Sequence, residues 1–121
     1  MDIMKFGFLE RRYIRLKKYN KLVRDKIPEI IENDGRKAKV RILSDEEYIA
    51  ELDKKLNEEV NEYQTDKSLE EMADVLEVLH AICKARGYKV EELEKKRSEK
   101  HADRGGFDKK LYLMHVEDSV I

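Results

Sequence analysis

Two stretches in the middle of the chain carry apolar residues at helical spacing. In the first stretch the apolar side chains recur every three or four residues: Ile49, Leu52, Leu56, Val60 and Tyr63. The second stretch has a broader apolar stripe: Leu69, Met72, Val75, Leu76, Leu79, Ile82 and Cys83. This spacing predicts two amphipathic helices, over about residues 44–63 and 68–85.

Both helices begin at a predicted capping box, in which a serine caps the helix and a glutamate three residues later reaches back. The two pairs are Ser44 with Glu47 and Ser68 with Glu71. Residues 64–67 form a short predicted loop between the helices. Because so short a loop returns the chain on itself, we expect an antiparallel helical hairpin.

Weaker patterns flank the hairpin. A short helix is expected over residues 25–33, with Asp25 as its cap and Pro28 in its first turn. Residues 37–43 alternate between apolar and basic side chains, which predicts an extended connector or a short strand. A mostly polar helix is expected over about residues 90–102, before a pair of glycines.

The two ends of the chain have mixed patterns. Within residues 1–18, Phe6 and Phe8 alternate as in a strand and a run of basic residues follows. The tail, residues 107–121, has the pattern of a partly apolar strand or an irregular segment. A chain of 121 residues with 40% hydrophobic residues has enough material for one modest core. We therefore expect a basic extension over residues 1–18 and one domain over residues 19–121.

The expected helices give a thin core for a single chain. On the second helix, Val78, Ala81 and Ala85 lie on a small, apolar face that needs a covering surface. The expected fold class is therefore all-α, with a helical hairpin that oligomerisation completes to a four-helix-type bundle. Short extended segments are expected at the N-terminal connector and in the C-terminal tail. The expected assembly is a homodimer or a tetramer.

Composition excludes several classes of protein. The single cysteine, Cys83, excludes a disulfide within the chain, and no Cys or His residues stand at metal-ligand spacing. No apolar run approaches the roughly 20 residues that span a bilayer, and the first residues lack the apolar core of a secretion signal. These features predict a cytoplasmic protein without a membrane partner.

Charge is segregated along the chain although the net charge is only -1. Residues 1–43 carry 13 Lys and Arg against 6 Asp and Glu, whereas residues 44–94 carry 6 against 16. A ligand made of phosphate and a divalent cation would suit this layout, but composition alone favours the simpler explanation that the blocks neutralise one another. The acidic middle argues against a broad phosphate-binding face, so no nucleic-acid partner is expected.

Several acids of the hairpin lie unexpectedly close to its apolar faces. Glu59 lies about 20° from Leu52 around the first helix, and Glu62 follows on the same side. Glu71 and Asp74 are also three residues apart, on the second helix. Semi-buried carboxylates repel one another unless a cation joins them, and Mg²⁺ prefers oxygen ligands of this kind. The pattern therefore favours a metal site.

A solvated helix surface is the alternative explanation for the acids. In that case Glu58, Glu59 and Glu62 would form salt bridges with Lys54 and Lys55. The same spacing recurs on the next helix, also at the apolar margin. This recurrence favours the metal site over the solvated surface.

The acids also follow the order seen in a known family. Residues 58–62, Glu-Glu-Val-Asn-Glu, followed by residues 71–74, Glu-Met-Ala-Asp, resemble the EExxE…ExxD signature of the MazG-like all-α nucleoside triphosphate pyrophosphatases. That superfamily includes phosphoribosyl-ATP pyrophosphohydrolase. Residues 19–28 and 104–107 resemble its compact phosphoribosyl-ATP pyrophosphohydrolase-like branch. The resemblance covers residues 19 to about 113.

The resemblance implies Mg²⁺-dependent hydrolysis of a nucleotide between its α and β phosphates, with Mn²⁺ as an alternative metal. The metal ligands that it implies are Glu59, Glu62, Glu71 and Asp74. It assigns Glu58 a catalytic role, as a ligand of a second metal ion or as the base that orients water. The candidates for binding the substrate phosphates are Lys21, Arg24, Lys26, Arg97, Lys100 and Arg104. Ordinary surface charge is the alternative for each of these cations.

Three functions remain open at this stage. House-cleaning of the nucleotide pool is the first, and phosphoribosyl-ATP hydrolysis in histidine synthesis is the second, since both reactions use the same metal and phosphate chemistry. A non-catalytic helical protein whose hairpin only dimerises is the third.

Overall fold

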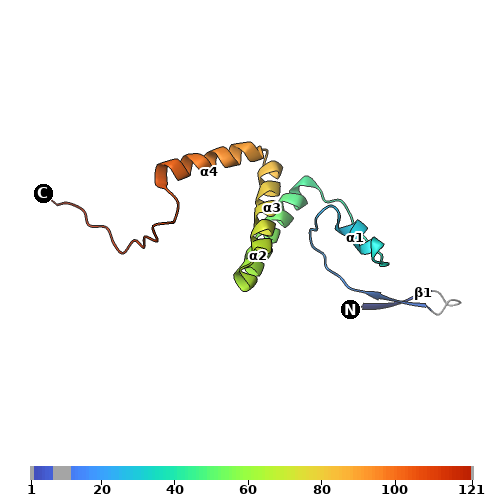
Figure 1. Ribbon diagram of the computed structural model, residues 1–121. Coiled ribbons are helices and arrows are strands. Elements are labelled where there is room, and N and C mark those ends of the chain that lie inside the picture. The colour runs from blue at the N-terminus through green and yellow to red at the C-terminus, as the bar shows by residue number, and fades with distance from the viewer. Residues whose placement is uncertain (1, 7–11, 121) are drawn as a thin grey trace.

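The computed structural model describes residues 2–6 and 12–120 of the chain (Figure 1). The elements in chain order are β1 (Asp2–Phe6), β2 (Arg12–Leu16), α1 (Ile27–Asn33), α2 (Asp45–Asp66), α3 (Leu69–Ala85) and α4 (Val90–Arg104). Between residues 17 and 120, all of which are described, the chain contains helices and irregular segments but no strand. The prediction of a helical protein is confirmed for this part.

Helices α2 and α3 form the predicted hairpin and lie side by side (Figure 1). The junction is shorter than the predicted loop over residues 64–67, because α2 continues to Asp66. Lys67 ends the helix in a left-handed conformation, with φ at 55°, while its N–H donates to the Tyr63 carbonyl at 2.7 Å. Only Lys67 and Ser68 therefore separate the two helices.

The two predicted capping boxes have different outcomes. At the start of α2, the Ser44 hydroxyl accepts from the Glu47 N–H at 3.2 Å and the Glu47 carboxylate accepts from the Ser44 N–H at 3.3 Å. At the start of α3, the Ser68 hydroxyl accepts from the Glu71 N–H at 3.2 Å. The Glu71 carboxylate instead joins other acids on α2 and α3, so the second box is only half formed.

The Glu47 carboxylate predicts a pH dependence of stability. Its hydrogen bond with Arg41, followed by the one from the Ser44 N–H, lowers its pKa from 4.5 to about 2. This contribution is present above pH 4.5 and is lost as pH falls toward 2, because protonation removes the charge that Arg41 binds. The melting-temperature difference between wild type and Glu47→Gln should therefore shrink as the pH falls from about 5 to about 2. This range spans the ordinary pKa of a glutamate, 4.5, and the lowered pKa of Glu47, about 2.

The control for this experiment is Glu46→Gln, on the neighbouring exposed residue in the first turn of α2. A difference between wild type and Glu47→Gln that stays constant across the same pH range would contradict the prediction. Melting curves followed by circular dichroism measure both variants.

Helix α1 begins two residues later than predicted. Lys26 is its N-cap residue, and no side chain caps the helix, so the assignment of Asp25 as the cap was wrong. The Ile27 N–H donates to the Arg24 carbonyl at 3.0 Å, which places a turn before the helix. Pro28 lies in the first turn, as predicted. Residues 37–43 form an irregular connector rather than a strand.

Helix α4 runs to Arg104, two residues beyond its predicted end. It is joined to α3 through Gly87, whose φ of 88° favours glycine. The buried Cys83 thiol donates to the Lys89 carbonyl at 3.4 Å. The tail that follows α4 is irregular to residue 120.

The buried core is small and lies between α2 and α3. Its apolar members are Leu52, Val78 and Cys83. The expectation that Val78 needs a second copy to cover it was wrong, since only 8% of this residue is exposed. Val78 shares its side of α3 with Val75 and Ile82, which are three and four residues away and are half-buried. Ala81 and Ala85 are half-buried.

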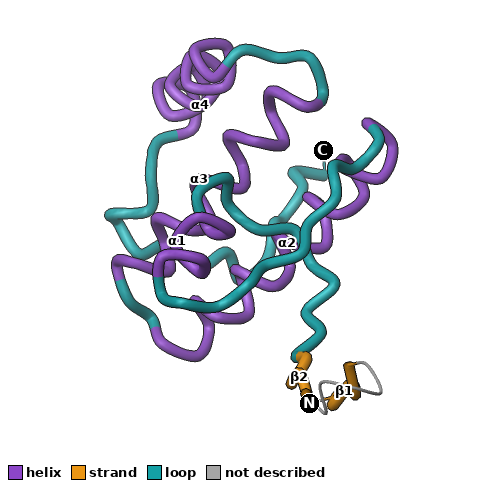
Figure 2. The backbone as a smooth tube through the Cα atoms, turned by 90° about the vertical axis from the view of Figure 1, so that its right-hand side faces the viewer, coloured by secondary structure: helices purple, strands orange, loops and turns teal. Residues whose placement is uncertain are grey.

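The N-terminal strands form a two-stranded antiparallel ladder in which Asp2 pairs with Leu16 and Phe6 with Arg12. Figure 2 shows this ladder apart from the helices. The undecided pattern of residues 1–18 thus contains a strand that ends at Phe6, whereas Phe8 lies outside the described residues. In the described part of the chain, no helix has the length and apolar character required to cross a membrane.

Candidate metal centre

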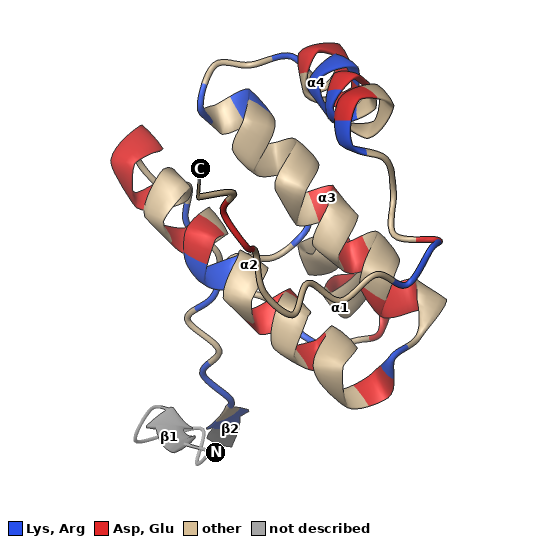
Figure 3. Cartoon of the chain, turned by 90° about the vertical axis from the view of Figure 1, so that its left-hand side faces the viewer, with Lys and Arg blue, Asp and Glu red and all other residues tan. Residues whose placement is uncertain are grey.

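Acidic residues occur on both α2 and α3 along the stretch where the two helices lie side by side (Figure 3). One group contains Glu58, Glu59 and Glu62, and a second contains Glu59, Glu71 and Asp74. Within each group, one carboxylate oxygen per residue lies within 4.8 Å of the others. Glu59 belongs to both groups and therefore lies at the centre of the acidic cluster, which we define as these five residues.

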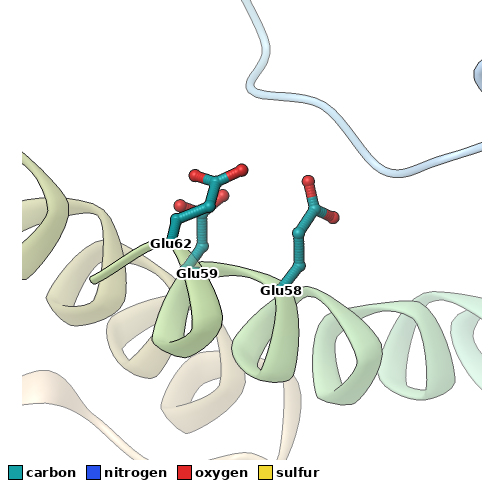
Figure 4. A group of neighbouring side chains, drawn as sticks. All are labelled: Glu58, Glu59 and Glu62. Carbon is teal, nitrogen blue, oxygen red and sulfur yellow. The ribbon is translucent and has the colours of Figure 1, made fainter. Parts of the chain in front are cut away.

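Local helix geometry explains the arrangement. Residues three and four apart share a side of a helix, so Glu58, Glu59 and Glu62 rise from the same side of α2 (Figure 4). Glu71 and Asp74 are one turn apart near the start of α3. Because the junction between the helices is only two residues long, the start of α3 lies beside the end of α2. The hairpin thereby brings together all four acids that were predicted as metal ligands.

Glu59 is the least exposed charged residue among those with described side chains, at 7%. Its Oε1 lies 3.4 Å from Lys55 Nζ, but its Oε2 is buried without a hydrogen-bond partner in the described structure. The Oε2 atom of Glu71 is buried and unpartnered in the same way. Buried carboxylate oxygens without donors are costly, and a cation is one group that removes this cost.

Two acids of the cluster, Glu59 and Glu71, lie where the charged form of a carboxylate is unfavourable. Burial, followed by the close approach of the like-charged Glu62 carboxylate, raises the pKa of Glu59. Burial, followed by repulsion from Asp74, raises the pKa of Glu71. A divalent cation reverses these effects because it attracts every carboxylate in the cluster.

Two of the predicted phosphate-binding cations lie at the cluster. Lys21 Nζ donates to Glu58 Oε1 at 3.0 Å, and Arg24 Nη2 donates to Asp74 Oδ1 at 2.6 Å. The hydrogen bond with Lys21 is the main reason why the pKa of Glu58 is lowered. The segment before α1 therefore places one cation on the α2 side of the cluster and one on the α3 side.

The remaining predicted cations do not reach the acids within one chain. Lys26 is exposed at the start of α1. Arg97 donates to Glu94 at 2.6 Å, on α4 itself. Lys100 and Arg104 are exposed on the same helix, which leaves α3 at the end opposite to Glu71 and Asp74 (Figure 1).

Lys55 was predicted to pair with Glu58 and Glu59 only in the solvated-surface alternative, and the structure shows both of these contacts. Its side chain is only 16% exposed and lies 3.5 Å from Glu58 and 3.4 Å from Glu59. The three- and four-residue spacing from these acids is the signal that identifies it. Lys54, the other lysine of the solvated-surface alternative, pairs with Glu51.

The arrangement is that of a candidate site for a divalent cation. Its ligands are partly buried carboxylate oxygens, and basic side chains lie at its margin. Comparisons with known proteins add little to it. No protein-family model matches the sequence, and no solved structure matches it. A protein of Mycolicibacterium smegmatis described as uncharacterized is 61% identical over 41 residues, which are 34% of this chain and 42% of that protein. The chain thus spans less than half the length of that relative.

Proposed function

We propose that the chain is a MazG-like nucleotide pyrophosphohydrolase, which uses Mg²⁺ to cleave a nucleoside triphosphate or a related nucleotide between the α and β phosphates. The products would be the monophosphate and pyrophosphate. The observation that carries the proposal is the buried, unpartnered Oε2 of Glu59 inside a cluster of five acids. A carboxylate so placed is poorly suited to a structural role and well suited to a divalent cation.

The residues of the cluster fit Mg²⁺ by number and type. Glu59, Glu71 and Asp74 would bind one ion across the two helices, and Glu62 would add a further carboxylate. Mg²⁺ usually keeps several waters and takes a few carboxylates together with substrate phosphates. When bound, the ion would neutralise phosphate oxygens and lower the pKa of a coordinated water.

Lys21 and Arg24 would bind the phosphates of the substrate. Both side chains are about half exposed, at 42% and 57%, so they can turn from their acids toward a ligand. Arginine binds phosphate through two parallel hydrogen bonds, and lysine binds it as a point charge. Their position at the margin of the cluster would orient the pyrophosphate group as it leaves.

Glu58 would act on the water molecule that attacks the phosphate. Its lowered pKa keeps it ionised and makes it a weak proton acceptor, which favours a ligand or a water-orienting group over a strong general base. Glu59 has the opposite character, because its pKa is raised.

Pyrophosphate release tests the proposal directly. We expect release from at least one nucleotide in a panel of standard triphosphates, damaged triphosphates and phosphoribosyl-ATP, and only when Mg²⁺ or Mn²⁺ is present. Preference for phosphoribosyl-ATP would select the alternative function in histidine synthesis. Metal-independent release, or no release from any member, would contradict the proposal and favour a non-catalytic interaction protein.

The proposed assembly is a homodimer or a tetramer, in which hairpins of different copies form a four-helix-type bundle. Support comes from the outer side of α3, where apolar residues remain exposed in the single chain. Leu76 and Leu79, in the middle of that side, are 51% and 39% exposed. Packing two such stripes against each other would bury them. The enzyme would act in the cytoplasm, without a nucleic-acid or membrane partner.

A further inference from the structure

The chain exposes much more surface than a compact protein of its size. Its accessible surface is 11,895 Å², whereas a compact monomer of 14.4 kDa exposes roughly 6,800 Å². The excess is therefore roughly 5,000 Å². An interface of standard size removes about 800 Å² from each partner, so one contact between hairpins leaves most of the excess exposed.

Several of the exposed large apolar side chains belong to the segment that follows α4. We define the C-terminal arm as residues 107–116. Its large apolar side chains are between 72% and 97% exposed: Phe107, Leu111, Tyr112, Leu113, Met114 and Val116. So dense a run of exposed apolar residues is the composition of a segment that binds an apolar surface.

A matching surface lies on the hairpin. Val60 and Tyr63 of α2, with Met72 and Val75 of α3, line an open apolar groove near the junction of the two helices. Val60 directly follows Glu59 and Met72 directly follows Glu71, so each points about 100° away from its acidic neighbour.

The arm is poorly placed to reach the groove of its own chain. Helix α4 starts at the end of α3 that lies away from the groove, and the arm continues outward from α4 (Figure 1).

We propose that the C-terminal arm of one copy binds in the apolar groove between α2 and α3 of a second copy. This contact buries apolar surface of the arm and of the groove at the same time. It would therefore cover part of the excess accessible surface that remains exposed after two hairpins have packed together. The proposed contact does not involve the residues of the acidic cluster. It can therefore be tested separately from the proposed hydrolase activity.

Disulfide trapping between two different full-length chains tests the proposal. One chain carries Leu113→Cys and the other carries Met72→Cys, each with its own affinity tag, and the two are co-expressed and mildly oxidised. We expect a disulfide-linked heterodimer that carries both tags. Wild type should form no such product, because its one cysteine, Cys83, is buried.

A matched control replaces Met72→Cys by Lys95→Cys, on exposed α4, and should give at least about tenfold less heterodimer. Adding Leu111→Asp to the Leu113→Cys chain should lower the yield by a similar factor, since it places a charge against the groove. Adding Ser119→Asp, outside the arm, should leave the yield unchanged.

Two results would overturn the proposal. The first is a chain with both Leu113→Cys and Met72→Cys that forms only an internal disulfide, because the arm would then cover its own groove. The second is wild-type protein that stays a monomer of 14.4 kDa in light scattering at micromolar concentration.

Discussion

Replacing Glu59 by glutamine is expected to abolish Mg²⁺-dependent pyrophosphate release, with a loss of about 100-fold or more in kcat/KM. The reason is that Glu59 belongs to both acidic groups and is almost fully buried. Glutamine keeps the shape of the side chain but cannot supply a charged oxygen to the ion. Glu71→Gln should behave in the same way, because its Oε2 is also buried without a partner.

The same substitutions should leave the metal-free protein as stable as wild type or more stable. Burial and like charges raise the pKa values of both acids, so each ionised carboxylate opposes folding near neutral pH. Mg²⁺ should raise the melting temperature of wild type and have a smaller effect on the two variants. Function and metal-free stability would thus change in opposite directions.

The control is Glu94→Gln, on exposed α4, where the acid pairs with Arg97. It should retain both activity and the Mg²⁺-induced rise in melting temperature. Wild type that melts at the same temperature with and without Mg²⁺, together with full activity in Glu59→Gln, would exclude the metal site.

Replacing Arg24 by alanine is expected to lower kcat/KM by about 10- to 100-fold, the range for loss of a charge-assisted hydrogen bond. Its guanidinium lies 2.6 Å from Asp74, at the margin of the acidic cluster where the phosphates would bind. Arg24→Lys should recover only part of the activity, because lysine lacks the two-pronged geometry of arginine.

Arg104→Ala is the informative comparison for this experiment. Arg104 lies on α4, away from the cluster of its own chain, so its loss should have little effect if each chain acts alone (Figure 1). A loss in Arg104→Ala as large as that in Arg24→Ala would show that a second copy supplies this cation. Unchanged kinetics in Arg24→Ala would remove Arg24 from the site.

Local sequence determined the helices and the position of the acids on them. Apolar spacing and the serine caps set the start of α2 and α3, because these signals act within one or two turns. The three-residue spacing of Glu59 and Glu62, and of Glu71 and Asp74, also placed each pair on one side of its helix. The start of α1 was missed because a turn at Arg24 competes with capping by Asp25.

Contacts between segments distant in sequence decided the remaining features. Glu71 leaves its capping position for the acidic cluster, and Val78 is buried within the single chain instead of by a second copy. Among six candidate cations, only Lys21 and Arg24 contact the acids, although their types and spacing do not distinguish them from the others. Sequence specifies which side chains share a helix face, because that depends on local backbone geometry. Only tertiary structure specifies which faces meet, because that depends on how the short junction at Lys67 and the segment before α1 direct the chain.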